Sequence, residues 1–403
     1  MRTARLITRR AGGLALSLML GFNVRTRPAL AQAVWEMPPR STPEDGTNGW
    51  VATVPFAADG NPMILVPVRV NGSPPGWWAL DSGSSVCLVD RGAARRLGLA
   101  TRGTRQIHGG GRGTVGIDSV SSRVRLDFGG GFTTACDHIA AVDLTGLTAD
   151  VGRPETGVLG YDLFARYVVE VDFAAHTLRL YDPARYRYAG TGDTVPITLV
   201  RRQPRVTIQV HDGGRPAVAR TLIVDSGSGD AVDDSLVRQS TTAPRYAVST
   251  SGLGASYHVE VGTLDTVRIG RFTLAAVPGV ASDVALIGNA VWGRFTCVFD
   301  YPHGRLFLEP NARFGGTFDR GPLGGLELFA AAYRRMPTVS TVHERSAAAR
   351  AGLQVGDVLV TVDGRPATDF GVERLSVLLN RPGNVYRVGI ARGGTHLERV
   401  LRL

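Results

Sequence analysis

The tripeptide Asp-Ser-Gly occurs twice, each time after an apolar segment, and it is the strongest chemical signal in the 403-residue chain. Residues 81–84 read Asp-Ser-Gly-Ser, and residues 225–228 repeat these four letters. The glycine lets the backbone turn with no Cβ in the way. If the two loops meet, the carboxyl groups of Asp81 and Asp225 cannot both ionise and must share a proton. The ionised carboxylate can then activate a water while the protonated carboxyl polarises a carbonyl group.

Both loops belong to an internal repeat that must position them. An apolar-apolar-Gly segment follows each loop, as Val158-Leu159-Gly160 and as Leu286-Ile287-Gly288. Further along, residues 164–173 align with residues 292–301, and each copy ends in a strand-like stretch. The same landmarks in the same order, twice, indicate a duplicated domain rather than a short-period array.

The predicted secondary structure of both copies is mainly β. Short, alternating, β-branched segments such as residues 64–70 are separated by Gly and Asp, which is typical of strands. Helical patterning is brief, for example at residues 91–97. The high glycine content, 51 residues, also favours short strands and many turns over long helices. We expect two homologous lobes, at residues 49–187 and 190–312.

The composition changes after Gly316, and the remaining residues fit one small α+β domain, expected at 318–403. Residues 346–353 predict a short helix that ends at a glycine cap. Residues 355–364 predict a strand that enters an Asp-Gly hairpin turn. A second helix around residues 371–379 and a last pair of strands complete the unit.

The N-terminal segment predicts export. Basic residues precede the apolar stretch 11–22, which is the pattern of a secretory signal. A small-residue cleavage site follows at Ala29-Leu30-Ala31, with a second option at Ala31-Gln32-Ala33. The Thr8-Arg9-Arg10 sequence is compatible with a twin-arginine signal. We expect residues 1–33 to direct the protein to the periplasm or the medium and residues 34–48 to form a flexible lead-in. An uncleaved membrane anchor is the alternative, although the stretch 11–22 is too short for a transmembrane helix, which needs ~20 apolar residues. Past residue 22 no apolar run approaches that length, which argues against a multi-span membrane protein.

Charge and spacing argue against nucleic-acid and metal partners. The net charge of +10 falls to +4 without the six arginines of residues 1–33, and the other arginines are scattered rather than clustered. No pair of His or Cys residues has the spacing of metal ligands, so we expect neither a metal nor an organic cofactor. One disulfide among Cys87, Cys136 and Cys297 is compatible with an oxidising compartment, and so are three buried free thiols.

The two loops and their partner segments resemble the pepsin and retropepsin superfamily of aspartic proteases over roughly residues 60–310. The resemblance implies two β-barrel lobes of about six to seven strands each, nearer in size to retropepsin subunits than to pepsin lobes. It implies that Ser82 and Ser226 hydrogen-bond across the loops, and that the hydroxyls of Ser84 and Ser228 support the carboxylates. The residues so implicated are catalytic Asp81 and Asp225; supporting Ser82, Gly83, Ser84, Ser226, Gly227 and Ser228; and a flap at His108, Gly109, Gly110 and Gly111. Unlike a pepsin flap, this segment has no tyrosine.

The C-terminal segment resembles a PDZ domain of the bacterial type, through residues 348–359 and Val362-Asp363-Gly364. In such domains backbone N–H groups capture a terminal carboxylate and a strand edge pairs with an extended peptide. The resemblance assigns peptide binding to Gly324, Gly325, Leu326 and Leu328.

These features predict an exported aspartic endopeptidase. Its PDZ domain would recruit the C-terminus of another protein or regulate access to the active site. Its partners would be an extended peptide or protein substrate and a C-terminal peptide ligand. The alternative is an inactive, exported scaffold that binds peptides in the PDZ groove and in the cleft between the lobes. The two intact Asp-Ser-Gly loops argue against the scaffold, whereas the missing flap tyrosine is compatible with it.

Overall fold

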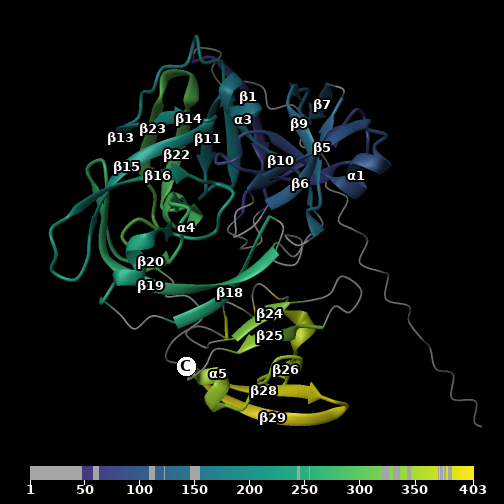
Figure 1. Cartoon of the computed structure of the whole chain (residues 1–403), viewed down its shortest axis with the longest axis vertical. Helices are drawn as coiled ribbons and strands as arrows, with labels where there is room; N and C mark the ends of the chain where they lie inside the picture. Colours follow the sequence, from purple (N-terminus) through teal and green to yellow (C-terminus); the bar gives the residue numbers. More distant parts are fainter. Residues whose placement is uncertain are drawn as a thin grey trace, which may run out of the picture. The chain divides into compact units, whose positions relative to one another are not determined.

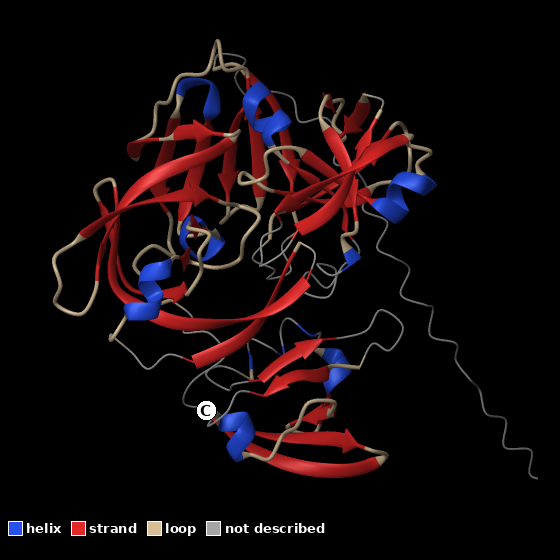
Figure 2. Ribbon diagram, in the orientation of Figure 1, coloured by secondary structure: helices blue, strands red, loops and turns tan. Residues whose placement is uncertain are grey.

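A computed structural model gives the fold of the chain. It describes residues 48–57, 63–108, 114–121, 123–145, 155–242, 246–253, 255–318, 326–329, 336–342, 346–370, 372, 375, 378–379 and 384–403. The expected export signal and nearly all of the expected lead-in lie outside these residues. Within them, no helix is long and apolar enough to cross a membrane. Strands dominate the secondary structure (Figure 2), so the expectation of a mainly β fold is confirmed.

The first lobe is built on one nine-stranded sheet, in the order β5-β6-β9-β4-β10-β3-β2-β7-β8. Its strands are β2 (Leu65–Val70), β3 (Gly76–Leu80), β4 (Cys87–Asp90), β5 (Thr101–His108), β6 (Thr114–Val120), β7 (Val124–Asp127), β8 (Thr133–Cys136), β9 (Ile139–Val142) and β10 (Glu155–Leu159). Two short helices accompany them, α1 (Arg91–Arg96) and α3 (Tyr161–Arg166). Asp90 caps α1, since its side chain accepts a hydrogen bond from the amide of Ala93.

The second lobe contains a closed barrel of six strands, β15-β16-β21-β17-β20-β19, because β15 also pairs with β19. Strands β14 and β18 extend the same sheet at its two ends. The elements are β14 (Thr198–Val200), β15 (Gln203–His211), β16 (Val218–Val224), β17 (Val232–Asp233), β18 (Tyr246–Gly252), β19 (Ala255–Ile269), β20 (Phe272–Val280), β21 (Leu286–Ile287), the 3₁₀ helix η1 (Ser235–Gln239) and α4 (Asn289–Trp292).

A six-stranded sheet is shared by the two lobes, in the order β1-β12-β11-β22-β23-β13 (Figure 1). At its centre β11 pairs with β22, and Val169 lies opposite Phe299. The segments that the repeat aligned therefore lie side by side. The elements are β1 (Trp50–Pro55), β11 (Val168–Asp172), β12 (Thr177–Tyr181), β13 (Asp193–Pro196), β22 (Phe295–Asp300), β23 (Arg305–Pro310) and the 3₁₀ helix η2 (Tyr301–His303).

One hydrophobic core runs through both lobes and includes Trp78 and Phe164 of the first and Trp292 and Phe299 of the second. The ring of Phe164 stacks on that of Tyr301, with centroids 4.9 Å apart. Because apolar burial contributes roughly 25 cal/mol per Å², a core that crosses the junction ties the stability of each lobe to the other.

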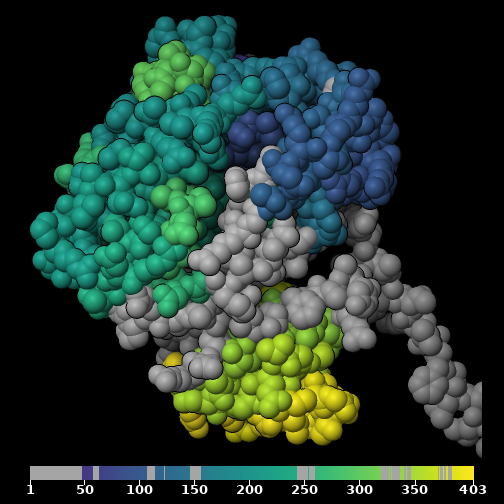
Figure 3. Space-filling model, viewed as in Figure 1, coloured from purple at the N-terminus to yellow at the C-terminus, as the bar shows by residue number. Residues whose placement is uncertain are grey.

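The third domain has a hydrophobic core of its own and a sheet in the order β24-β25-β26-β28-β29, with β27 beside β26. Its residues pack into one body in the space-filling view, in yellow-green and yellow (Figure 3). Asp357 is fully buried and is neutralised by Arg392, whose Nε lies 2.6 Å from Asp357 Oδ1. Phe318, the expected first residue of this domain, packs into the core of the lobes. The elements are β24 (Leu326–Phe329), β25 (Thr338–Val342), α5 (Ala347–Arg350), β26 (Val358–Val362), β27 (Arg365–Pro366), the 3₁₀ helix η3 (Ala367–Asp369), β28 (Val385–Arg392) and β29 (Thr395–Arg402).

The turn between β14 and β15 offers a first prediction. Its two residues, Arg201 and Arg202, have φ values of 51° and 69°, a conformation that suits Asn and Gly rather than Arg. We expect Arg201→Asn to raise the free energy of unfolding by about 0.5 kcal/mol, as measured by urea denaturation. An unchanged or lower stability would contradict this account of the turn.

Candidate active site

Each dyad residue directly follows a buried strand. Asp81 follows β3, and its amide donates to the carbonyl oxygen of Leu159 on β10 at 3.0 Å. In the second lobe, the amide of Asp225 donates in the same way to Ile287 on β21 at 2.9 Å. Strands β3 and β10 are parallel, as are β16 and β21. Two equivalent strand pairs therefore carry the two carboxyl groups, and the apolar-apolar-Gly segments lie behind the loops.

The glycines of the two loops bring the carboxyl groups together. A Cβ atom on Gly227 would lie 2.3 Å from Cγ of Asp81, and one on Gly83 would lie 2.8 Å from Cγ of Asp225. Neither glycine has a positive φ. The need for glycine therefore comes from the close approach of the opposite lobe's carboxyl group, more than from a special turn.

Two serines join the loops by four hydrogen bonds. Ser82 Oγ donates to the carbonyl oxygen of Val224 at 2.7 Å and accepts from the amide of Ser226 at 2.9 Å. Ser226 Oγ donates to Leu80 at 2.9 Å and accepts from the amide of Ser82 at 2.9 Å. Both serines are fully buried, so these bonds are shielded from water. The arrangement is the one that the resemblance implied.

On the outer side of each loop, the hydrogen bonds of Ser84 and Ser228 differ from those that the resemblance implied. The amide of Ser84 donates to Asp81 Oδ1 at 2.8 Å, whereas its hydroxyl donates to the carbonyl oxygen of Val86. In the second lobe the amide of Gly227 donates to Asp225 Oδ1 at 2.8 Å, and Ser228 Oγ accepts from the amide of residue 230. Backbone amides thus hold the carboxylates, and the hydroxyls of Ser84 and Ser228 brace the loops.

Three further side chains support the loops, and the sequence analysis did not find them. Tyr301 Oη donates to the carbonyl oxygen of Ser82 at 2.7 Å, and Gln203 Nε2 donates to that of Gly83 at 2.7 Å. Both reach from the second lobe to the first. Asn289 Nδ2 donates to the carbonyl oxygen of Ser226 at 2.8 Å. One of these residues had a signal in the sequence. Tyr301 aligns with Phe173 in the repeat, so the second copy carries a hydroxyl group where the first has none.

The two carboxyl groups interact electrostatically. Burial raises the pKa of Asp225 well above its ordinary value, and the charge of Asp81 and the hydrogen bond between the two carboxyls raise it further. The amide of Gly227 acts on this pKa in the opposite direction. A proton is therefore retained by the pair where isolated aspartates would be ionised.

The predicted flap falls at the tip of the β5–β6 hairpin, where His108 lies opposite Thr114. Gly109, Gly110 and Gly111 lie outside the described residues. The second lobe has a corresponding hairpin, β18–β19, in which Gly252 lies opposite Ala255. Each lobe therefore contributes one hairpin of the kind that can cover a cleft.

The predicted peptide-binding strand of the third domain is β24. It stands at one end of the strand order, so one of its edges pairs with no other strand among the described residues. Leu326 is buried in the core of this domain, and Leu328 packs against that core. Gly324 and Gly325 lie outside the described residues. An edge strand is the element to which a peptide can add.

A cavity of about 550 Å³ adjoins the second loop at Gly229. Its wall combines apolar side chains, among them Phe56 and Phe318, with the cationic side chains of Arg294 and Arg313. Neither Asp81 nor Asp225 lines it.

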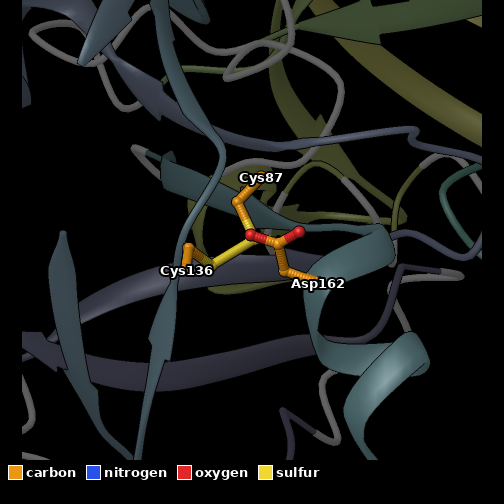
Figure 4. Close-up of side chains that lie close together, drawn as sticks. All are labelled: Cys87, Cys136 and Asp162. Atoms are coloured by element: carbon orange, nitrogen blue, oxygen red, sulfur yellow. A yellow bond between two sulfur atoms is a disulfide. The ribbon is translucent and has the colours of Figure 1, made fainter. Parts of the chain in front are cut away.

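Three possible metal ligands, Cys87, Cys136 and Asp162, gather in the first lobe (Figure 4). The two sulfur atoms form a disulfide, so they are not available as thiolate ligands. Asp162 accepts hydrogen bonds from the amides of Asp137 and His138 at 2.8 and 2.7 Å. The cluster is therefore a structural crosslink, and it settles the pairing that the sequence left open.

The disulfide carries a prediction about stability. It joins residues 49 apart in the sequence, Cys87 on β4 and Cys136 on β8. We expect the double variant Cys87→Ser/Cys136→Ser to lose about 3 kcal/mol of unfolding free energy, because the crosslink restricts the unfolded chain. Urea denaturation measures the loss. The control is Cys297→Ala, which leaves the disulfide intact, and equal stability with and without dithiothreitol in the parent would contradict the prediction.

Comparisons with known families agree with this geometry. Residues 66–163, which include the loop of Asp81, match the family model described as aspartyl protease. Residues 338–383 match the model described as PDZ domain. A comparison with curated proteins found no match. The chain therefore contains an aspartyl protease domain followed by a PDZ domain, as its motifs predicted.

Proposed function

We propose that the protein is an exported aspartic endopeptidase in which Asp81 and Asp225 together hydrolyse peptide bonds. The observation that supports this most directly is the approach of each carboxyl group to the glycine of the opposite loop. Paired carboxyls that share one proton are the means by which aspartic proteases activate water. The family match to a protease domain is in keeping with this reading.

In the proposed reaction the ionised carboxylate takes a proton from water while the water oxygen bonds to the scissile carbonyl carbon. The protonated carboxyl gives its proton to the carbonyl oxygen. The resulting tetrahedral intermediate collapses as the C–N bond breaks. The amine nitrogen takes the proton that came from water, and a hydroxyl of the intermediate returns the other proton to the dyad. No covalent link to the enzyme forms.

The substrate we propose is an extended peptide or an unfolded protein segment, held between the two lobes and covered by the flap. The free edge of β24 would pair with the C-terminal peptide of a substrate or regulator. Action outside the cytoplasm fits the disulfide, which persists in oxidising compartments.

The function is tested with the chain from Val34 onward, incubated with a mixed peptide library from acid to neutral pH. Products are identified by mass spectrometry, and the double variant Asp81→Asn/Asp225→Asn serves as the blank. Internal cleavage by the parent alone would support the endopeptidase. No cleavage by either protein, together with capture of peptides by the parent, would favour the binding scaffold. Sequencing the N-terminus of the protein from the periplasmic fraction tests export and cleavage near residue 33.

The role of the PDZ domain is tested with the same protein. Peptides with a free C-terminus should bind, whereas the same peptides with an amidated C-terminus should bind at least tenfold more weakly, because the amide removes the charge that the backbone N–H groups capture. Equal binding of both peptides would contradict recognition of a terminal carboxylate. Fluorescence anisotropy gives both affinities.

A further inference from the structure

Each carboxyl group of the dyad is bound by the N–H of a peptide unit whose carbonyl oxygen accepts from a side-chain amide. In the first lobe this peptide unit joins Gly83 and Ser84. Its N–H donates to Asp81 Oδ1 at 2.8 Å, and its carbonyl oxygen accepts from Nε2 of Gln203 at 2.7 Å. Two successive hydrogen bonds therefore connect Gln203, through one peptide unit, to the carboxyl group of Asp81.

The second lobe contains an equivalent pair of bonds, around the peptide unit that joins Ser226 and Gly227. The N–H of this unit donates to Asp225 Oδ1 at 2.8 Å, and its carbonyl oxygen accepts from Nδ2 of Asn289, also at 2.8 Å. Asn289 is the first residue of α4 and is only 5% exposed, so its bond is shielded from water. We call each pair of bonds an amide relay.

Duplication of the lobes does not by itself produce the amide relays. In the repeat, Tyr161 takes the place of Asn289, directly after the apolar-apolar-Gly segment. When the hairpins β2–β3 and β15–β16 are aligned by their registers, Met63 takes the place of Gln203. Neither Tyr161 nor Met63 has a side-chain amide. The second lobe therefore supplies the side chain of both relays, one to its own loop and one to the loop of the first lobe.

The residue before Gln203 also contacts the first lobe. The guanidinium carbon of Arg202 lies 5.4 Å from the centre of the Tyr161 ring, which is a cation–π contact. The amide of Tyr161 in turn donates to the carbonyl oxygen of Ser84 at 3.0 Å. Two adjacent side chains of the second lobe thus hold the loop of Asp81 and the segment that supports it.

A side-chain amide behind a peptide unit changes what that unit can do for a carboxylate. A hydrogen bond to the carbonyl oxygen polarises the peptide unit and strengthens the bond that its N–H donates, by about 10–30%. Hydrogen bonds donated to a carboxylate favour its charged form. Burial raises the pKa of Asp225, and the hydrogen bond from the amide of Gly227 lowers it. A relay that strengthens this bond therefore stabilises negative charge on the dyad.

We propose that Gln203 and Asn289 are positioning residues, which orient and polarise the two peptide units that bind the dyad and so stabilise its negative charge. Gln203 acts on Asp81, and Asn289 acts on Asp225. The dyad must carry a negative charge to take a proton from water, so the relays support that step of the reaction. This inference rests on the proposed endopeptidase function.

The ionisable groups around the dyad are the same in the parent and in the variants that remove a relay. Burial raises the pKa of Tyr301 well above its ordinary value. Burial and the charge of Asp225 raise the pKa of Asp230. Burial and the charges of Asp230 and Asp225 raise the pKa of Asp233. Because these groups and Arg202 remain in place, a changed pH profile reports the loss of the amide.

The kinetic test compares Gln203→Met with the parent, using the chain from Val34 onward and a peptide found in the library digest. Methionine keeps the length of the side chain but cannot donate a hydrogen bond. The pH profile of kcat/KM gives two apparent pKa values, which belong to the dyad as a pair. Their sum should rise by about 0.5 pH unit, because the fully ionised pair loses a stabilising contact whichever aspartate ionises first.

Matched variants control for the loss of an amide elsewhere. Gln209→Met should keep the parent profile, since Gln209 lies on the same strand and is half-buried like Gln203. Asn289→Leu should raise the same sum. Its control is Asn311→Leu, because Asn311 Nδ2 also donates to a backbone carbonyl, that of Gly293, at 3.0 Å. A uniform loss of kcat/KM with both apparent pKa values unchanged would show a merely structural role and overturn the proposal.

A second measurement, by nuclear magnetic resonance, needs no catalysis. Cell-free synthesis with isotope labels at glycine carbonyl carbons and serine amide nitrogens selects the Gly-Ser peptide units, at residues 72–73, 83–84 and 227–228. In Gln203→Met the amide proton of Ser84 should move upfield, because its hydrogen bond to Asp81 weakens. The signal of residues 72–73 should stay in place. An unmoved amide proton of Ser84 would overturn the relay.

The two measurements separate this inference from the proposed function. A parent that cleaves, with unshifted pKa values in Gln203→Met, contradicts the inference alone. A parent that cleaves nothing contradicts the endopeptidase, and the amide proton of Ser84 then decides whether the relay operates. If Asn289→Leu fails to fold, Gln203→Met carries both measurements, because Gln203 is only half-buried.

Discussion

Asp81→Asn and Asp225→Asn should each lower kcat for peptide cleavage by about 10³-fold or more, because either change removes one half of the acid–base pair. Asparagine has nearly the same shape, so the backbone amides that hold the loops keep a side-chain oxygen to bond. Both variants should therefore fold. The measurement is kcat and KM on one peptide for the parent and for each variant.

The two losses should not add. Because the dyad acts as a unit, the double variant should be about as inactive as either single variant. Asp283→Asn, which removes an exposed carboxylate of the second lobe, should retain the parent activity. Cleavage that survives in either dyad variant would mean that a contaminant or a different group performs the chemistry.

The second large effect concerns the serines that join the loops. Ser82→Ala should lower the free energy of unfolding by about 4 kcal/mol, because it leaves the amide of Ser226 and the carbonyl group of Val224 buried and unpaired. Ser226→Ala should cost a similar amount. Urea denaturation measures both losses. Activity should fall in parallel, since the loops would no longer hold the carboxyls in position.

The controls for this prediction separate burial from hydrogen bonding. Ser121→Ala removes a solvent-exposed hydrogen bond, which the Ser121 hydroxyl donates to the carbonyl oxygen of Ala100. It should change the free energy of unfolding by less than about 1 kcal/mol. Ser82→Thr keeps the hydroxyl and should recover much of the loss in Ser82→Ala. If Ser82→Ala proved as stable as the parent, the four bonds across the loops would not be holding the lobes together.

Local sequence patterns predicted the strands, the two lobes and the loops, because apolar alternation and glycine are direct consequences of strand and turn geometry. The repeat went further, since it identified the segments around Val169 and Phe299 that pair at the centre of the shared sheet. It did not reveal that they pair with each other. Equivalence in a repeat says which residues share an environment, but contact between two copies depends on how the lobes pack.

The supporting contacts escaped prediction for the same reason. Gln203 and Tyr301 act on the loop of the first lobe from the second, and Tyr301 is 219 residues from Ser82 along the chain. The pairing of Cys87 with Cys136 likewise depends on the fold, which brings their Cα atoms within 6.5 Å although β4 and β8 are not adjacent in the strand order, and not on any spacing.

The division of the dyad between two lobes also has a consequence for the order of events during synthesis. The loops that meet are 144 residues apart, and the second loop rests on β21, which is made later still. In a growing chain the second loop therefore lacks its supporting strand until residue 287, and with it most of the second lobe, has been made. A chain cut off after the first lobe would, in addition, expose the edge of β11 that β22 normally covers, which favours aggregation. Under the proposed function, hydrolysis of peptide bonds would therefore begin only after the second lobe has been made and has folded onto the first.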